Sequence, residues 1–387
     1  MKVTLIHQYF KHPSEGGAIR SYYLSQGLLE KGHEVEVITA HNKKELKIAR
    51  VDGVKVYYLP IFYDNTLGKY QRIIAFVKFV FQSILLLHRL PRSNRLYVIS
   101  TPLTVGIIAL WSHYILRTRY IFEIGDLWPE APIQLGYIKN RLLKRILYGF
   151  ENLIYRKAYK IVAMSPDIER IINRGQQVLM IPNMADCEFF YPKEKPKKLL
   201  DQLGISTEFV VAYLGTAGRA NHLDYLLKVA QELHKTKLPA AIVVAAAGSE
   251  LEWLKAEVFK SKLSNVLFVP YTDKIGVQEL LAASDAVYIS FMKVPILASG
   301  SPNKFFDGLA AGKVIITNFG GWVKNEIDHA HCGFSYNPEQ PSEFISMLNP
   351  YLVDKKLTAT TQKNARKLAE EKYSRSLLVA EWLTLFE

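Results

Sequence analysis

One local pattern, a short apolar run followed by glycines and then a helical stretch, occurs twice in this chain of 387 residues. Residues 3–6 precede Gly16 and Gly17 in this way, and residues 209–214 precede a loop that runs from Gly215 to Gly218. A short apolar run of this kind is typical of a buried strand in a parallel sheet. A strand, a glycine loop and a helix open a Rossmann-like unit. The repeat therefore predicts an α/β protein with two Rossmann-like, doubly wound parallel-sheet domains.

The junction between these domains is marked by a Pro-Asn turn at residues 182–183 and by the Pro- and Lys-rich segment 191–198. We place the N-terminal domain at residues 1–185 and the C-terminal domain at residues 186–371. Neither glycine loop fits the Gly-x-Gly-x-x-Gly fingerprint of dinucleotide sites, which argues against an NAD enzyme. Further strands are expected at 34–40, 54–60, 95–100, 119–124, 160–163, 178–181, 242–247, 266–270 and 286–290.

The formal net charge is +13 at pH 7, which favours anionic partners such as nucleic acid, anionic lipid or phosphorylated substrates. No helix-turn-helix, zinc-finger or RNP pattern occurs, so nucleic acid is not expected as a partner. Cys187 and Cys332 lie far apart without neighbours at metal-ligand spacing, which is typical of unpaired thiols in a reducing compartment. The residues after Lys2 do not form a signal sequence, so we expect a cytoplasmic location.

Two stretches are candidates for membrane contact. The apolar run 73–87 is shorter than the ~20 residues that a spanning helix needs, and basic residues flank it. We expect a mostly buried helix whose exposed part contacts a membrane face, with a purely buried core helix as the alternative. Residues 141–160 predict a basic helix with interleaved aromatic side chains. Such a helix is either a solvated surface helix or a surface that rests on anionic lipid head groups.

Residues 299–321 contain a Pro-Asn-Lys turn, a short amphipathic helix and a buried strand. A helix that begins at Asn303 offers unpaired backbone N–H groups and a positive dipole end to an anion such as a diphosphate. Lys304 adds a cation at the same end. Asp307 follows one turn later on the same helix face, where its carboxylate can accept hydrogen bonds from a ribose diol. The alternative is an ordinary capped helix with a solvated acid in its first turn.

Polar residues also follow other predicted strands. The strand at 119–124 leads into Gly125-Asp126-Leu127-Trp128-Pro129-Glu130. Ligands of open parallel sheets bind at the carboxyl ends of the strands, so Asp126 and Glu130 lie at such an edge, beside a Trp128 ring that can stack on a sugar. A plain helix N-terminus is the alternative. Arg219, after the second glycine loop, has a fork of donors suited to a diphosphate, unless it is an ordinary surface arginine.

The segment Ser-Pro-Asn-Lys-Phe-Phe-Asp-Gly-Leu-Ala-Ala-Gly-Lys at 301–313 resembles the nucleotide-sugar motif of the retaining GT-B glycosyltransferases, family 4. Asp-Leu-Trp-Pro-Glu at 126–130 resembles an acceptor-side motif of the branch that includes bacterial fucosamine transferases of surface-polysaccharide synthesis, whose members often have arginine where Gly125 stands. The family usually has two acids eight positions apart; the second corresponds to Asp307, and the first falls on Ser299. The resemblance implies two domains that face a cleft, and a C-terminal helix at 372–387 that completes the N-terminal domain.

The resemblance also implies roles for individual residues. It makes Arg219 and Lys304 the cations that hold the donor diphosphate and places Asp126 in the catalytic cleft, with no protein nucleophile named. Tyr271 and Thr272 are expected at the nucleobase, and Trp128 and Glu130 on the acceptor side. The full set of expected donor-binding residues is Gly16, Gly17, Gly215, Gly218, Tyr271, Thr272, Ser299, Asn303 and Asp307.

The implied function is transfer of a hexosyl or N-acetylhexosaminyl group from a nucleoside diphosphate sugar, UDP-linked by analogy. The acceptor implied is a polyprenyl-diphosphate-linked glycan of an O-antigen or capsule, and the anionic inner surface of the cell membrane is the implied location. The sequence contains no Asp-x-Asp pair, so we expect a metal-independent enzyme without a cofactor. The alternatives are a nucleotide-sugar epimerase or hydrolase on the same fold, a non-catalytic nucleotide-sugar-binding protein, and an unrelated doubly wound binding module.

Overall fold

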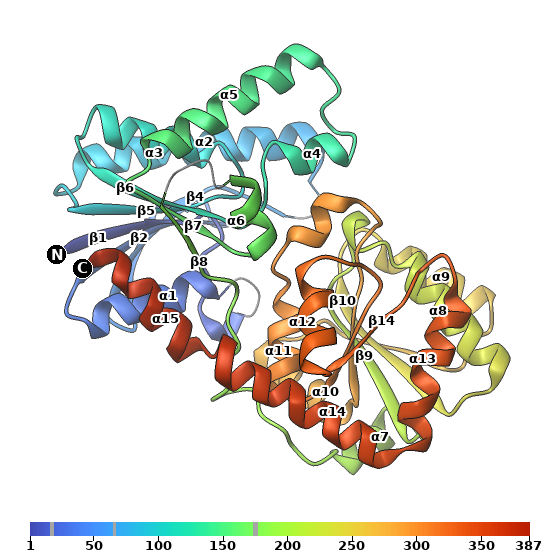
Figure 1. The fold of residues 1–387 in the computed structure, drawn as a ribbon. Coiled ribbons are helices and arrows are strands. Elements are labelled where there is room, and N and C mark those ends of the chain that lie inside the picture. Colours follow the sequence, from blue (N-terminus) through green and yellow to red (C-terminus); the bar gives the residue numbers. More distant parts are fainter. Residues whose placement is uncertain (16–18, 65–66, 173–176) are drawn as a thin grey trace. The chain divides into compact units, whose positions relative to one another are not determined.

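The structure is a computed structural model that describes residues 1–15, 19–64, 67–172 and 177–387 (Figure 1). The described chain forms two compact units. The N-terminal unit consists of Met1–Pro182, Ser299–Ser301 and Leu378–Glu387, and the C-terminal unit consists of Asn183–Ala298 and Pro302–Leu377. The units therefore divide slightly before the expected junction at 185–186, and the chain rejoins the N-terminal unit at Leu378 instead of at 372.

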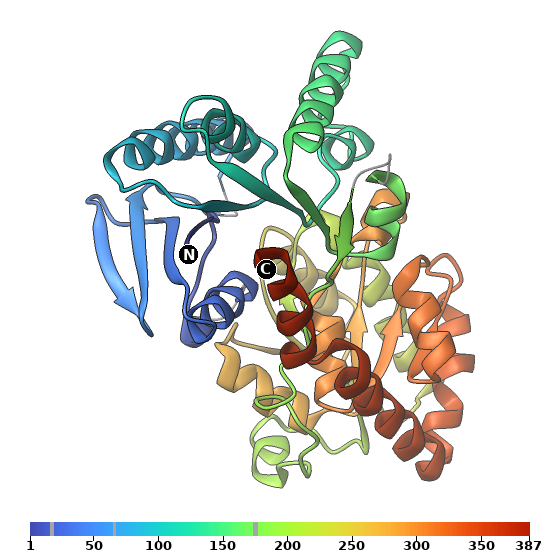
Figure 2. The same ribbon diagram turned by 60° about the vertical axis from the view of Figure 1, so that its left-hand side comes forward.

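The N-terminal unit is a sheet covered by helices on both faces (Figures 1 and 2). Its described strands have the order β3-β4-β2-β1-β5-β6-β7-β8. Neighbouring strands pair in parallel except for β3 and β4. In chain order its elements are β1 (Lys2–Ile6), α1 (Arg20–Glu30), β2 (Glu34–His41), β3 (Lys47–Val51), β4 (Val54–Pro60), α2 (Lys69–Arg89), β5 (Arg95–Ile99), α3 (Val105–Tyr114), β6 (Arg119–Ile124), α4 (Glu130–Gln134), α5 (Arg141–Lys157), β7 (Lys160–Ala163), α6 (Pro166–Ile172) and β8 (Val178–Met180).

The C-terminal unit is a second α/β layer structure, and every residue from 183 onward is described. Its strands have the order β11-β10-β9-β12-β13-β14, and all of these pairs are parallel. In chain order its elements are α7 (Lys197–Gln202), β9 (Phe209–Thr216), α8 (Asp224–Thr236), β10 (Ala240–Ala247), α9 (Leu251–Lys260), β11 (Val266–Val269), α10 (Lys274–Ala283), β12 (Ala286–Ile289), α11 (Asn303–Ala310), β13 (Val314–Thr317), α12 (Trp322–Ala330), β14 (Gly333–Ser335), α13 (Pro341–Val353) and α14 (Lys355–Leu368). The last helix, α15 (Arg375–Leu383), begins in this unit, and its residues from Leu378 onward belong to the N-terminal unit.

These two parallel-sheet units confirm the predicted fold class. The central strands β1 and β6 are almost entirely buried, because helices cover both faces of a parallel sheet and leave no face to water. The antiparallel edge strand β3 was not predicted. It is joined to β4 by Asp52 and Gly53, which have φ values of 45° and 89°, and two successive positive φ angles are typical of a tight hairpin turn.

The last turns of α15 pack into the N-terminal unit, as the resemblance implied for the C-terminal helix. The buried Trp382 ring lies 4.9 Å from the Tyr97 ring, centroid to centroid, in an edge-on contact. A Cβ built on Gly27 of α1 would lie 2.4 Å from Val379 Cγ1. Gly27 therefore permits a close approach of α1 and α15 that a larger residue would prevent.

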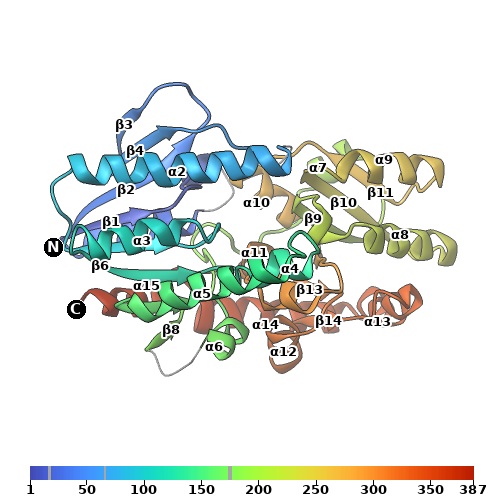
Figure 3. The same cartoon turned by 90° about the horizontal axis from the view of Figure 1, so that it is seen from above.

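The helix α2 differs from the prediction for the apolar run 73–87. It extends over Lys69–Arg89, and 28% of its most apolar window is buried, so the prediction of a mostly buried helix is wrong. By length and composition it is the one helix among the described residues that could cross a membrane, a test that core helices also pass. Figure 3 shows α2, α3 and α5 side by side over the same sheet.

Candidate functional site

The glycine segment from Gly215 to Gly218, which begins in the last residues of β9, lies against the side chain of Lys304 at Gly215. Gly215 has a φ of 116°, which L side chains rarely adopt. A Cβ built on Gly215 would lie 3.3 Å from Lys304 Cε and 3.4 Å from Nζ. Lys304 Nζ also lies 4.9 Å from the centroid of the Tyr213 ring, a distance at which an ammonium group is attracted to an aromatic face. The predicted glycine loop and the predicted cation are therefore brought together.

The start of α11 lies at the same place. Pro302 occupies the N-cap position with φ −74° and ψ 125°, and within the described C-terminal unit no side chain caps this helix end. Asn303 is exposed and Lys304 half-buried. The backbone N–H groups and the positive dipole end of α11 are thus directed toward the space beside the glycine loop. This is the arrangement that binds a phosphate at a helix N-terminus.

Burial changes the charge state of the two ionisable residues of α11. It lowers the pKa of Lys304 to about 8, although the negative charge of Asp307 opposes this shift. Burial likewise raises the pKa of Asp307 to about 7, against the opposing charge of Lys274. Both groups therefore titrate close to physiological pH, in a place where an anionic ligand would favour the charged lysine.

Lys274, the first residue of α10, was missed by the sequence analysis. It is buried, donates a hydrogen bond to Asp186 Oδ2 and lies 4.0 Å from the centroid of the Phe189 ring. Arg375 Nη1 lies 3.2 Å from Asp186 Oδ1. Lys274 and Asp186 are 88 residues apart in the sequence, so no local spacing could have indicated that they meet beside Asp307.

The other predicted donor-binding residues differ in their positions and exposure. Tyr271 and Thr272 lie just before α10, with Tyr271 54% exposed. Asp273 caps α10 by accepting a hydrogen bond from Gly276 N at 3.0 Å. Arg219 is exposed and begins a short 3-10 turn after Gly218. Gly16 and Gly17 lie outside the described residues.

The N-terminal unit holds the predicted residue Asp126 at the carboxyl end of β6. Thr101, at the end of the neighbouring β5, donates a hydrogen bond from Oγ1 to Asp126 Oδ2 at 3.4 Å. Asp126 is exposed at the surface, but desolvation by the surrounding protein atoms raises the pKa of its carboxyl group. Thr101 has a φ of 127°, which is costly for a β-branched residue and is often found at functional sites. Thr101 was not predicted, because backbone strain leaves no mark in a single sequence.

The acceptor-side candidates are held by α4 and α5. Glu130 accepts hydrogen bonds from the Tyr148 hydroxyl and, at 2.7 Å, from Gln134 Nε2. Both of its carboxylate oxygens are therefore engaged within the unit. Trp128 is half-buried beside it. Ser299, predicted among the donor-binding residues, belongs by its contacts to the N-terminal unit, where its carbonyl accepts a hydrogen bond from Ser165 Oγ at 2.6 Å.

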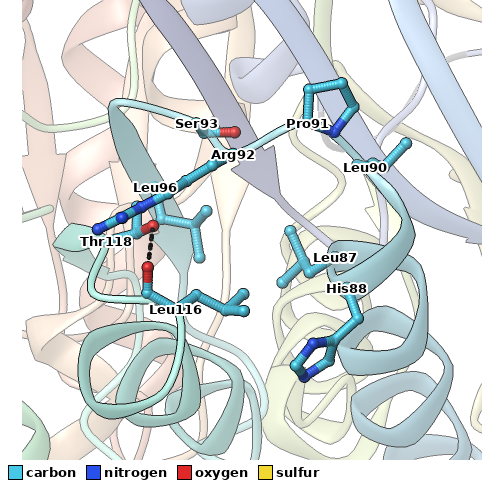
Figure 4. Close-up of a pocket in the computed structure, with 9 residues that line it drawn as sticks. All are labelled: Leu87, His88, Leu90, Pro91, Arg92, Ser93, Leu96, Leu116 and Thr118. Carbon is cyan, nitrogen blue, oxygen red and sulfur yellow. Dashed lines mark hydrogen bonds between the residues drawn. The ribbon is translucent and has the colours of Figure 1, made fainter.

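A cavity of about 110 Å³ lies elsewhere in the N-terminal unit (Figure 4). It is formed by the end of α2, the loop to β5 and the segment before β6, and so lies at the amino ends of these strands. This is the edge opposite to the one where parallel sheets bind ligands, and ligand pockets usually have several times this volume. Its lining residues are Leu87, His88, Leu90, Pro91, Arg92, Ser93, Leu96, Leu116 and Thr118.

Solved structures share this fold over the whole chain. Sucrose-phosphate synthase from Thermosynechococcus elongatus superposes with a TM-score of 0.78 at 15% identity, covering 100% of this chain and 98% of that one. HepE of Anabaena in complex with UDP-glucose gives 0.72 at 18% identity and 100% of both chains. WaaG, a glycosyltransferase involved in lipopolysaccharide biosynthesis, gives 0.70 at 15% identity and 99% of both chains. These likenesses define a GT-B fold.

Family models match both halves of the sequence. Residues 15–183 match the glycosyl transferase 4-like domain, and residues 196–368 match the glycosyl transferases group 1. With the fold, these matches show that the chain belongs to the GT-B glycosyltransferases. A curated relative, an uncharacterized 42.6 kDa protein in the cps region of Klebsiella pneumoniae, is 35% identical over 66 residues, a segment that spans 17% of each protein.

Proposed function

We propose that this protein transfers a sugar from a nucleoside diphosphate sugar, most simply a UDP-sugar, to an acceptor hydroxyl. The observation that carries the proposal is the position of Lys304, which lies along Gly215 at the uncapped start of α11. When the sugar leaves, negative charge develops on the diphosphate. Lys304 and the backbone N–H groups of α11 are proposed to stabilise that charge, with Arg219, directly after Gly218, as a second cation.

The remaining roles are proposed from the family resemblance. Asp307, one turn along α11, is proposed to accept hydrogen bonds from the ribose diol, and Tyr271 and Thr272 to contact the base. Gly16, Gly17, Gly215 and Gly218 are proposed to let the phosphates approach the backbone. On the N-terminal unit, Asp126, whose pKa desolvation raises, is proposed to act on the acceptor, with Trp128 and Glu130 shaping its binding. We propose metal-independent transfer with retention of configuration, the latter from the family resemblance.

The proposed acceptor is a polyprenyl-diphosphate-linked glycan at the cytoplasmic side of the cell membrane. The resemblance of residues 126–130 to the fucosamine-transferase branch of family 4 supports this assignment. It also agrees with the involvement of the structural neighbour WaaG in lipopolysaccharide biosynthesis and with the Klebsiella relative, which is a protein in the cps region. The product would be a longer glycan of an O-antigen or capsule type.

Nucleotide binding tests the donor half of this proposal. A thermal-shift screen of UDP, ADP and GDP should identify UDP as the ligand that raises the melting temperature most. In titration calorimetry, Lys304→Met should weaken UDP binding by about 10- to 100-fold, because a charge-assisted hydrogen bond is lost. Lys324→Met is the matched control, since Lys324 is exposed on α12 and pairs with Asp328. Equal UDP affinity of Lys304→Met and wild type would contradict the proposal.

A product assay tests the reaction itself. The donor is a UDP-sugar that is radiolabelled in its sugar. If the protein is a transferase, label should appear in the lipid-linked fraction when acceptor is present and should be absent from that fraction when acceptor is omitted. Release of free sugar, or epimerised nucleotide sugar, in both conditions would instead identify a hydrolase or an epimerase. UDP binding without any turnover would identify a non-catalytic nucleotide-sugar-binding protein.

A further inference from the structure

The outer side of α2 is an apolar strip. Tyr70, Ile73, Ile74, Val77, Phe81 and Leu85 recur at helical spacing and are exposed, Tyr70 to 80% and Phe81 to 62%. The opposite side, which includes Ala75 and Phe79, is buried. A contiguous apolar surface along a helix of 21 residues is unusual on a soluble protein and marks a site of interaction.

The strip continues onto the two neighbouring helices. Figure 3 shows α3 and α5 beside α2 over the N-terminal sheet, and α3 packs against both of the others. On α3, Ile107 and Trp111 are exposed, and on α5, Leu142 and Ile146 are exposed, Leu142 to 68%. We name the exposed sides of α2, α3 and α5 the three-helix face.

The charges of the three-helix face have one sign. Among the described residues of these helices, Glu151 is the one acidic residue; it is buried and accepts a hydrogen bond from the Tyr155 hydroxyl at 2.9 Å. The exposed cations among the apolar side chains include Lys78, Arg141 and Arg145. A second copy of the same face would bring like charges together. An anionic bilayer offers apolar chains and negative head groups in one surface.

We propose that the three-helix face docks on an anionic lipid bilayer, with α2 lying in the plane of the head groups instead of crossing the membrane. The buried side of α2, with Phe79 fully buried, packs on α3 and β4. Insertion of α2 across a bilayer would therefore break the contacts between this side and the rest of the N-terminal unit. Lys78 lies at the middle of the helix, where a spanning segment would place it in hydrocarbon. An in-plane helix keeps the Lys78 ammonium group at the head groups.

This inference deepens the proposed function, because a lipid-linked acceptor lies in the same bilayer, but it rests on the exposed surface and not on the donor site. The test is flotation of the full chain with vesicles of phosphatidylethanolamine and phosphatidylglycerol, compared with phosphatidylcholine alone. Wild-type protein should float with the anionic vesicles, and the bound fraction should fall as salt is raised. The double variant V77D/F81D should bind at least about tenfold less.

A matched control separates the three-helix face from apolar exposure in general. Phe259 of α9, in the C-terminal unit, is 87% exposed, and Phe259→Asp should leave vesicle binding unchanged. The double variant should keep the melting temperature and the UDP affinity of wild type, because both substituted side chains are exposed and lie outside the donor site. Failure of the wild-type protein to bind UDP would count against the proposed function but not against the docking proposal.

Three outcomes would overturn the docking proposal. One is equal vesicle binding by V77D/F81D and wild type, and another is absence of binding by wild type to anionic vesicles. The third is resistance of the bound wild type to extraction with alkaline carbonate, which would show a spanning helix. A dimer seen by light scattering that V77D/F81D dissociates, without vesicle binding by wild type, would assign the face to a second copy.

Discussion

Lys304 and Asp307 give nucleotide binding a pH dependence that can be worked out residue by residue. The free protein has a Lys304 pKa of about 8 and an Asp307 pKa of about 7. A bound diphosphate favours protonated Lys304, so UDP affinity should fall as the pH rises through 8. A ribose diol favours ionised Asp307, so affinity should also fall as the pH drops below 7. On the acid limb and on the alkaline limb of this profile, UDP affinity should change by up to about tenfold per pH unit. Calorimetry from pH 6 to 9 should find the tightest binding between 7 and 8.

Two variants assign the limbs of this profile. Lys304→Met should lack the alkaline limb, and Asp307→Asn should lack the part of the acid limb that belongs to the carboxylate, leaving only titration of the nucleotide phosphate. An alkaline limb that persists in Lys304→Met would show that another group controls binding.

Side chains that come together within one local segment could be predicted from the sequence, and side chains that meet across distant segments could not. Asn303, Lys304 and Asp307 share one turn of helix, so their common face followed from helical spacing. Lys274 and Asp186 meet only because the chain folds α10 against the linker. Thr101 is notable for its positive φ and its hydrogen bond to Asp126, neither of which a composition or spacing pattern encodes.

At the scale of elements, a buried ion pair ties α1 to the centre of the N-terminal sheet. Arg20 Nη2 lies 2.9 Å from Glu123 Oε2, both side chains are buried, and Arg20 also donates to the carbonyl of Ile181 at 3.0 Å. Removing one partner leaves an uncompensated buried charge. Glu123→Ala should therefore cost about 3–5 kcal/mol of unfolding free energy, measured by urea denaturation.

The control for this prediction is an exposed pair. Glu252 of α9 lies 2.8 Å from Lys255 Nζ, with 81% of its side chain exposed, so Glu252→Ala should cost less than about 1 kcal/mol. Similar costs for Glu123→Ala and Glu252→Ala would mean that the Arg20 pair contributes no more than a surface contact.

Elements with a strong local signal were predicted and those that depend on context were not. β1 and β9 are apolar runs before glycines, and their positions were predicted to within a few residues. β3 was missed, although Asp52-Gly53 is a hairpin turn pair, because its side chains are largely exposed and carry no apolar period. For α2, the sequence indicated a helix, but only the fold decides which of its apolar side chains are exposed, among them Ile73, Val77 and Phe81.

For the whole molecule, the doubled strand–glycine–helix pattern predicted two Rossmann-like parallel-sheet domains, and the resemblance of residues 301–313 to a family motif implied the GT-B class. Substrate identity does not follow from the fold, since one fold supports many chemistries. The structural neighbours are 15 to 18% identical to this chain, so their ligands guide the proposal without deciding it. The proposed function therefore rests on the proposed donor site within the C-terminal unit.

The central claim is that the diphosphate of the donor binds at the start of α11, between Lys304 and the Gly215 loop. A crystal structure of the protein with UDP tests it most directly. The account predicts diphosphate oxygens within hydrogen-bond distance of Lys304 Nζ and of the first backbone N–H groups of α11, with the ribose on Asp307. UDP bound at another place, with Lys304 still lying along Gly215 and Asp307 free of the nucleotide, would contradict it.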